Sequence, residues 1–267
     1  GDTFNGAVTF VRSSSGAFEP AYNNTNFFAS DVTINSNAVL TLANGNGTVE
    51  FTGGNAQSIN KTFSTPTPVF SRIHLNKSSN LVTLNTDVSI SILATFTSGI
   101  VNTDATNFLN FADNATVTGA NDLSYVDGPV RKTGNDPFDF PVGDNGFYRP
   151  ISISAPTTTT HAFTAQYLNQ NHLLGSPAVW DPSFWTVSGC EYWTLDRNVG
   201  ASNVFVTLSW NEAACNPGYI TNPATLRVTR WTGTNWVDQG NGGTTGTATN
   251  GTIITSAAVT SFSPFTL

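Results

Sequence analysis

The sequence has 267 residues, enough for one large or two ordinary domains that each bury a core. Only 10% of the residues are charged, and the net charge is −7 with ten scattered Lys and Arg residues, which argues against a nucleic-acid partner. No apolar run approaches the ~20 residues that a membrane-spanning helix needs, so we expect no membrane insertion. Asn, Thr, Ser and Gly supply the polarity instead of charge, which favours an extracellular all-β protein over an amphipathic helical one.

Weak internal repeats mark the first hundred residues. Thr3–Phe10 aligns with Asn26–Ile34 at a spacing of 24, and TNFF at Thr25 resembles TVEF at Thr48 at a spacing of 23. A third pair, GAFEPAYN and AVLTLANG, is spaced by 22. A drifting period of about 23 residues is typical of one coil of a stacked β-solenoid.

Short strands separated by turn residues fill the same region. We expect them at Ala7–Val11, Asp31–Ile34, Val39–Leu42, Thr48–Phe51, Arg72–Leu75, Leu81–Leu84, Ser89–Phe96, Phe108–Phe111 and Thr116–Gly119. This spacing fits a sandwich or a solenoid. Asn and Thr recur at the strand corners, where stacked copies could form hydrogen-bonded ladders, so we favour a parallel β-solenoid (β-helix-like) over residues 1–132.

The stretch from Thr97 to Pro150 is expected to join the solenoid to a second domain. We place the end of the solenoid at the Asp127-Gly128-Pro129 step, because Pro129 lacks a backbone donor for continued pairing. Gly134–Gly146 is read as an acidic turn that starts the next domain, over residues 133–267.

The second half has longer and more regular strands. PFDFPVGDNGFYRPISISA predicts a hairpin, and in HAFTAQYL the residues Phe163, Ala165 and Tyr167 face opposite to Thr164 and Gln166. FWTVS, EYWTLDR, NVFVTLSW, TLRVTRW, NWVDQG, GTIITSAAV and FSPFTL supply seven further strands. The alternation and the turns every 8–12 residues predict an Ig-like β-sandwich.

Both cysteines, Cys190 and Cys215, lie in this half. In a chain that looks secreted we expect a disulfide; two buried free thiols are the alternative. A zinc site is disfavoured because there is no CxxC motif and no nearby His.

Asp136, Asp139 and Asp144 crowd the junction and are the only candidate metal ligands, for calcium, which prefers oxygen-rich loops. Their spacing matches neither an EF-hand nor an Asp-rich repeat loop, and Asx-turns at hairpin ends are the simpler interpretation. No other cofactor is expected.

Catalytic signals are weak. The acidic residues of the first 130 positions stand alone beside turns, and no pair shares a strand face as a polysaccharide-cleaving enzyme requires. His74, His161 and His172 are far apart, with His74 expected to be structural, and no GxSxG turn presents a nucleophile. We therefore expect no enzyme and no catalytic residues.

All six tryptophans also follow the junction. Trp231 and Trp236 lie on either side of a turn and, if exposed, could form a platform on which a polysaccharide stacks. The alternative is that Trp185, Trp193 and Trp210 fill the core while the others cover sheet edges.

Several long segments resemble a family of very large secreted surface proteins of Bacteroidetes. GDTFNGAVTFVRSSSGAFEPAYN resembles their tandem units, VDGPVRKTG followed by FDFPVGDNGFYRPISIS resembles the segment that closes such arrays, and EYWTLDR…VTLSW…LRVTRWTGTNWVDQG is similar to the sandwich that follows. Members are adhesin-like or fibre-like, and a sorting domain for type IX secretion usually comes next. The resemblance implies export to the cell surface. Since the sequence lacks Met and ends at Leu267, we expect a processed mature protein or a piece of a longer one.

Together these observations predict a non-enzymatic, extracellular or cell-surface structural or adhesive protein. It would be a fibre subunit or the terminal part of a long adhesin, and its partners would be copies of itself, joined head-to-tail through strand or solenoid-end pairing. The alternative is a carbohydrate-binding module whose partner is a surface polysaccharide.

Overall fold

A computed structural model describes residues 1–12, 23–36, 41–42, 46–62, 67–172, 179–262 and 264–267. The described chain is all-β, with two single-turn 3₁₀ helices at Glu212–Ala214 and Pro223–Thr225. It divides into two compact units, Gly1–Thr133 and Gly134–Leu267; the boundary expected from sequence followed Lys132. None of the described helices has the length and apolarity to cross a membrane.

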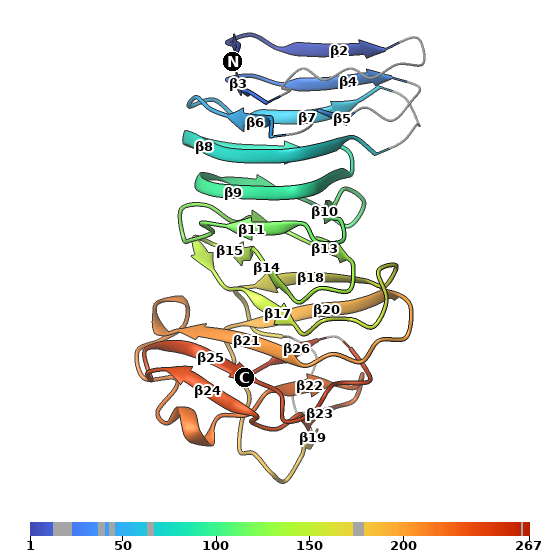
Figure 1. The fold of residues 1–267 in the computed structure, drawn as a ribbon. Coiled ribbons are helices and arrows are strands. Elements are labelled where there is room, and N and C mark those ends of the chain that lie inside the picture. Colours follow the sequence, from blue (N-terminus) through green and yellow to red (C-terminus); the bar gives the residue numbers. More distant parts are fainter. Residues whose placement is uncertain (13–22, 37–40, 43–45, 63–66, 173–178, 263) are drawn as a thin grey trace. The chain divides into compact units, whose positions relative to one another are not determined.

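Unit 1, Gly1–Thr133, is a parallel β-solenoid of about five turns (Figure 1). Its strands are β1 (Thr3–Phe4), β2 (Val8–Arg12), β3 (Thr25–Phe28), β4 (Val32–Ser36), β5 (Thr41–Leu42), β6 (Thr48–Phe51), β7 (Gln57–Lys61), β8 (Val69–Leu84), β9 (Val88–Asn102), β10 (Leu109–Phe111), β11 (Thr116–Thr118), β12 (Val126–Asp127) and β13 (Val130–Thr133). The long strands β8 and β9 pair with each other through three shifts of register, so each passes through successive faces of one coil.

The strand register confirms two of the predicted repeats. Phe4 pairs with Phe28 between β1 and β3, and Val8 pairs with Val32 between β2 and β4. β3 pairs with β6 so that Thr25 meets Thr48. The third repeat, GAFEPAYN with AVLTLANG, falls largely outside the described residues.

A column of large apolar side chains fills one side of the solenoid interior. Phe4, Phe28, Phe51, Leu75 and Phe96 occupy equivalent positions on five successive coils. The rings of Phe4 and Phe28 stack at 4.9 Å, and the last four residues are almost fully buried. Because each coil covers the apolar layer of the next, the core is continuous and no single coil could form it alone.

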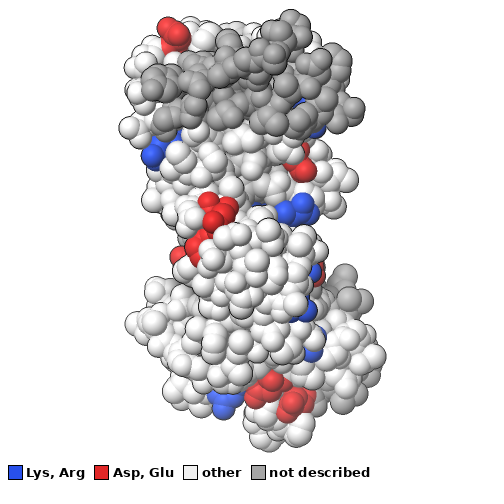
Figure 2. Space-filling model, turned by 45° about the vertical axis from the view of Figure 1, so that its right-hand side comes forward, with Lys and Arg blue, Asp and Glu red and all other residues white. Residues whose placement is uncertain are grey.

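Polar ladders run along the outside of the solenoid, as the recurrence of Asn and Thr predicts. Asn85 Nδ2 donates to Asn60 Oδ1 at 2.8 Å across two coils. Asn80 adopts a left-handed backbone with φ 62°, a conformation that Asn tolerates better than most residues. Uncharged polar side chains thus supply hydrogen bonds on the surface of this unit. On the face drawn in Figure 2, few of the described residues are charged.

The expected end of the solenoid at Pro129 is wrong. β13, which follows Pro129, continues the stack by pairing in parallel with β10, Leu109 opposite Val130. Pro129 lies at the corner between β12 and β13, where its missing amide interrupts no ladder, and Gly128 makes the corner with φ +121°.

Unit 2, Gly134–Leu267, contains two groups of strands. The first is an antiparallel sheet in the order β14 (Phe138–Phe140), β17 (Ile151–Ile153), β21 (Val206–Asn211), β25 (Asn250–Ile254) and β24 (Gly243–Gly246). The second runs β18 (Ala162–Leu168), β20 (Tyr192–Val199), β26 (Phe265–Thr266), β22 (Thr229–Trp231), β23 (Asn235–Asp238) and β19 (Val179–Trp180). Trp193 and Trp210 are fully buried, with their indole N–H groups donating to backbone carbonyls.

A two-residue hairpin joins β15 (Val142–Asp144) to β16 (Phe147–Tyr148), as the sequence predicts. Its central residues, Asn145 and Gly146, both have positive φ, which two-residue hairpins favour. The strand predicted at FWTVS is wrong, because residues 184–188 form a loop. A turn precedes this loop, and in it Asp181 Oδ1 accepts hydrogen bonds from the amide and the hydroxyl of Ser183.

Candidate functional site

The outer edges of β1 and β2, in the first coil of unit 1, have no strand partner among the described residues. Within the described residues, β1 pairs only with β3 and β2 pairs only with β4 (Figure 1). The amide of Val8 donates inward to Asp31 O at 2.9 Å, so the next amide, that of Thr9, points to the open edge. Unpaired edge amides and carbonyls are a template for pairing with another strand.

This edge has some of the features that protect edge strands and lacks others: β1 has only two residues and β2 ends in the charged Arg12. Natural edge strands carry Lys or Pro, and β1 and β2 contain neither. Val11, on the outer part of β2, is 67% exposed. Among the described residues, the outward amides and carbonyls of β2 therefore have no strand partner.

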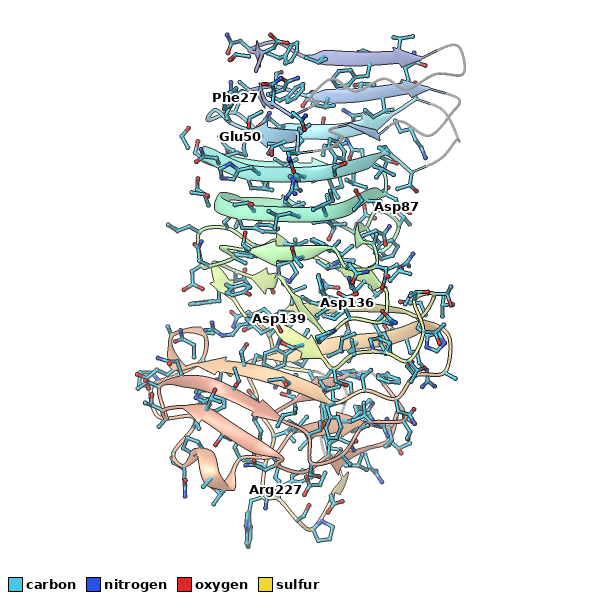
Figure 3. All side chains as sticks on the ribbon, in the orientation of Figure 1. Phe27, Glu50, Asp87, Asp136, Asp139 and Arg227 are labelled. Carbon is cyan, nitrogen blue, oxygen red and sulfur yellow. A yellow bond between two sulfur atoms is a disulfide. The ribbon has the colours of Figure 1, made fainter. Side chains whose placement is uncertain are left out.

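A polar chain crosses three coils on the outside of unit 1. His74 Nδ1 lies 3.0 Å from Glu50 Oε2, and His74 Nε2 lies 2.8 Å from Thr97 Oγ1. Asn76 Nδ2 donates to the other oxygen of Glu50 at 2.8 Å. In Figure 3, Glu50 lies one coil beyond Phe27, with which it pairs. A sequence motif could not reveal this chain, because its members are 24 and 23 residues apart and meet only through the coil period.

The order Glu50, His74, Thr97 resembles a catalytic triad, in which the carboxylate orients the imidazole and the imidazole acts as the base for the hydroxyl nucleophile. Here Thr97 lies inside strand β9 rather than on a strained turn, so nothing lifts its hydroxyl toward a substrate. The arrangement instead ties three coils together through hydrogen bonds, which is the structural role expected for His74.

The donor atoms of the three candidate calcium ligands do not all lie within 4.8 Å of one another in the described structure. Asp139 lies on β14 and is exposed; Figure 3 shows it together with Asp136. Asp144 Oδ2 accepts a hydrogen bond from the amide of Asn169 at 2.9 Å. Among the described residues, the sole group of three potential ligands with mutually close donor atoms is Cys190, Glu191 and Cys215. Asp136, Asp139 and Asp144 are not among them, so calcium binding by these residues stays a prediction.

Cys190 and Cys215 form a disulfide, with Cα atoms 5.6 Å apart. Their sulfur atoms are bonded to each other, so they offer no thiolate to a metal ion. The disulfide lies beside Glu191, which is completely buried.

Glu191 is the centre of a buried polar cluster in unit 2. Tyr167 donates to Oε2 at 3.0 Å and Tyr219 donates to Oε1 at 2.8 Å. Arg149 Nε lies 3.8 Å from Oε2, too far for a hydrogen bond. Burial raises the pKa of Glu191 to about 7, against the opposing effect of the two hydroxyl donors and Arg149. Burial also raises the pKa values of both tyrosines.

The predicted glycan platform at Trp231 and Trp236 is wrong. Only 8% and 2% of these residues are exposed, and their rings pack on each other at 5.4 Å. Trp185, expected in the core, is instead 98% exposed. Trp231 and Trp236 are cross-strand neighbours in the hairpin of β22 and β23, so their side chains lie on the same, buried face.

Two adjoining cavities flank Trp185 and Tyr219. One has a volume of about 420 Å³ and is bordered by Val187, Ser188 and Tyr219. The other, of about 410 Å³, is bordered by Trp185, Arg227 and the same Tyr219. These volumes are in the range of small-ligand sites, roughly 300–1,000 Å³.

Comparison of the chain with protein-family models, with curated proteins and with solved structures finds no match. The function must therefore be argued from the chain's own chemistry.

Proposed function

We propose that this chain is a non-enzymatic structural or adhesive component of an extracellular surface fibre or long adhesin. It assembles by adding a strand from another copy to the open edge of its first solenoid coil. The observation that carries this proposal is the edge of β1 and β2, which no described strand covers and whose one charged residue, Arg12, stands at the end of β2.

The solenoid suits a mechanical role. Its apolar column continues through the coils, so force applied along the stack is shared by parallel ladders and a continuous core. A strand added at β2 would extend the same ladder. A contact between unlike surfaces, repeated head-to-tail, produces a filament.

The extracellular location is part of the proposal. A disulfide persists in oxidising compartments, and a surface that relies on Asn and Thr rather than charge is compatible with them. The resemblance to Bacteroidetes surface proteins agrees with this location and with type IX secretion.

An Ig-like sandwich for unit 2 also belongs to the proposal. It is supported by the antiparallel sheet β14–β17–β21–β25–β24 and by the second group of strands in the same unit. In this arrangement unit 2 would be a compact terminal body and the solenoid a repeating spacer.

The proposal is tested by removing one outward amide. Thr9→Pro deletes the edge donor while leaving the inward hydrogen bond of Val8 to Asp31 in place. Thr9→Ala is the matched control, because it removes the exposed side chain and keeps the amide.

Sedimentation velocity over a wide concentration range and negative-stain electron microscopy provide the measurement. We expect the wild-type chain and Thr9→Ala to form linear oligomers as concentration rises, and Thr9→Pro to remain monomeric. A wild-type chain that stays monomeric throughout, or a Thr9→Pro variant that assembles normally, would refute the proposal.

A further inference from the structure

The loop that carries Trp185 is anchored on both sides of the exposed indole. Phe184 and Val187 pack against the buried pair Trp231 and Trp236. At its two ends, Asp181 N donates to Trp236 O at 3.3 Å and Ser188 N donates to Leu267 O at 2.7 Å. Trp185 nevertheless remains 98% exposed. The fold therefore presents this indole on a fixed support, which is unusual for so large an apolar group.

The two adjoining cavities beside Trp185 form one groove, and side chains that line it carry hydrogen-bond donors that the protein does not use. Asn222 accepts the amide of Ala224 with its Oδ1 atom, and its Nδ2 group has no partner within the described residues. Arg227 directs Nη1 to backbone carbonyls and places Nε 3.6 Å from Asp238 Oδ2, while Nη2 has no partner among the described atoms. Figure 3 shows Arg227 in unit 2, in the part of the chain that follows the second 3₁₀ helix.

The charge of this groove differs from that of the whole chain. The described residues that border the two cavities include one cationic side chain, Arg227, and no Asp or Glu side chain. The chain as a whole carries a net charge of −7. A ligand with carboxylate oxygens therefore meets one cation and no acidic side chain along the lining, with Asp238 lying 3.6 Å from Arg227 Nε.

We propose that this groove binds a segment of a polysaccharide, with Trp185 stacking on the apolar face of one sugar ring. Asn222 Nδ2 and Arg227 Nη2 donate to its hydroxyl or carboxylate oxygens. A pyranose ring matches the site because it combines one apolar face with a polar rim, as the groove combines an indole with a few donors. Tyr219, held in place by its bond to the buried Glu191, forms the shared wall of the two cavities.

This binding site is separate from the assembly edge proposed above, since it uses residues of unit 2 only. The two proposals can therefore fail independently. Trp185→Ala is expected to leave the sedimentation behaviour unchanged, and Thr9→Pro is expected to leave glycan binding unchanged.

Isothermal titration with cellohexaose, a neutral glucan, and with tetragalacturonate, a uronate, tests the inference on the full chain. We expect the wild-type chain to bind at least one of them, and Trp185→Ala to weaken that binding at least tenfold. Arg227→Gln is expected to weaken the uronate more than the glucan. Phe205→Ala is the control, because Phe205 is another exposed aromatic residue of unit 2, at 39%.

The inference would be overturned by no binding of either probe, by a Trp185→Ala variant that binds as tightly as wild type, or by an equal loss of binding in Phe205→Ala. A Trp185→Ala variant that loses oligomerisation but keeps glycan binding would also overturn it, since the indole would then be a protein contact.

Discussion

The buried carboxyl of Glu191 predicts that unit 2 becomes less stable as the pH rises toward neutrality. Burial raises its pKa from the ordinary 4.5 to about 7 in the folded chain. Below pH 4.5 both the folded and the unfolded chain hold the proton. Between 4.5 and about 7 the unfolded chain releases a proton that the folded chain keeps, so the free energy of unfolding falls with rising pH. Above about pH 7 both states have lost the proton, and the free energy of unfolding stays lower by the full amount.

The size of this effect follows from the two pKa values. Each pKa unit corresponds to 1.36 kcal/mol, so the loss of stability across the window is roughly 3 kcal/mol. No solvent screens the group, since Glu191 is completely buried. Glu191→Gln keeps the shape and cannot ionise; its amide oxygen accepts one tyrosine hydroxyl, and the other hydroxyl must turn to accept from the amide nitrogen. The variant should therefore remove the pH dependence and make the protein more stable than wild type at pH 8.

Urea unfolding followed by tryptophan fluorescence at several pH values between 4 and 8 measures this effect. All six tryptophans lie in unit 2, so the signal reports its unfolding alone. Glu212→Gln is the matched control, because Glu212 is partly exposed and its replacement should leave the wild-type slope intact. A wild-type stability that does not fall across the window, or a Glu191→Gln variant that retains the wild-type slope, would refute the reasoning.

Three further changes test the fold. Replacing both Cys190 and Cys215 by Ser, which opens a sequence separation of 25, should cost about 3 kcal/mol in the same urea assay, and an unchanged midpoint would contradict this. Lys77→Met should destabilise unit 1 by about 2 kcal/mol in hydrogen-exchange mass spectrometry, because the buried ammonium donates to three oxygens of the neighbouring coil; unaltered protection would count against it. Gly128→Ala should lower the melting temperature measured by circular dichroism, since the new Cβ would lie 2.4 Å from a backbone oxygen at φ +121°. Gly6→Ala, with no atom within 4 Å, should not lower it; equal effects would disprove this account.

The N-terminal architecture could be predicted from sequence because residues in contact between neighbouring coils of a solenoid recur at a regular spacing along the chain. Phe4 and Phe28 are neighbours in space because they are one coil apart, so alignment of the chain with itself reveals the pairing. The hairpin at Asn145-Gly146 was equally visible, since its turn depends on local backbone geometry. Pro129 misled the prediction because a proline ends a ladder only where its amide would have been paired, and a corner needs no such amide.

The candidate sites were decided by tertiary structure. The Glu50–His74–Thr97 chain depends on side chains that share a face of the stacked coils. Composition showed six tryptophans but not their exposure: Trp236 is buried, while Trp185 is held outward by a loop whose anchors lie elsewhere in the sequence.

The sequence by itself determined the all-β character, the coil period and the local turns, because these depend on residues that are adjacent or regularly spaced. Only the tertiary structure decided that Glu191 is buried among two tyrosines and an arginine, and that the edge of β2 is uncovered by described strands. Burial and exposure are sums over contacts from distant parts of the chain. A side chain's chemistry is fixed by its type, but its pKa and its availability to a partner are fixed by those contacts.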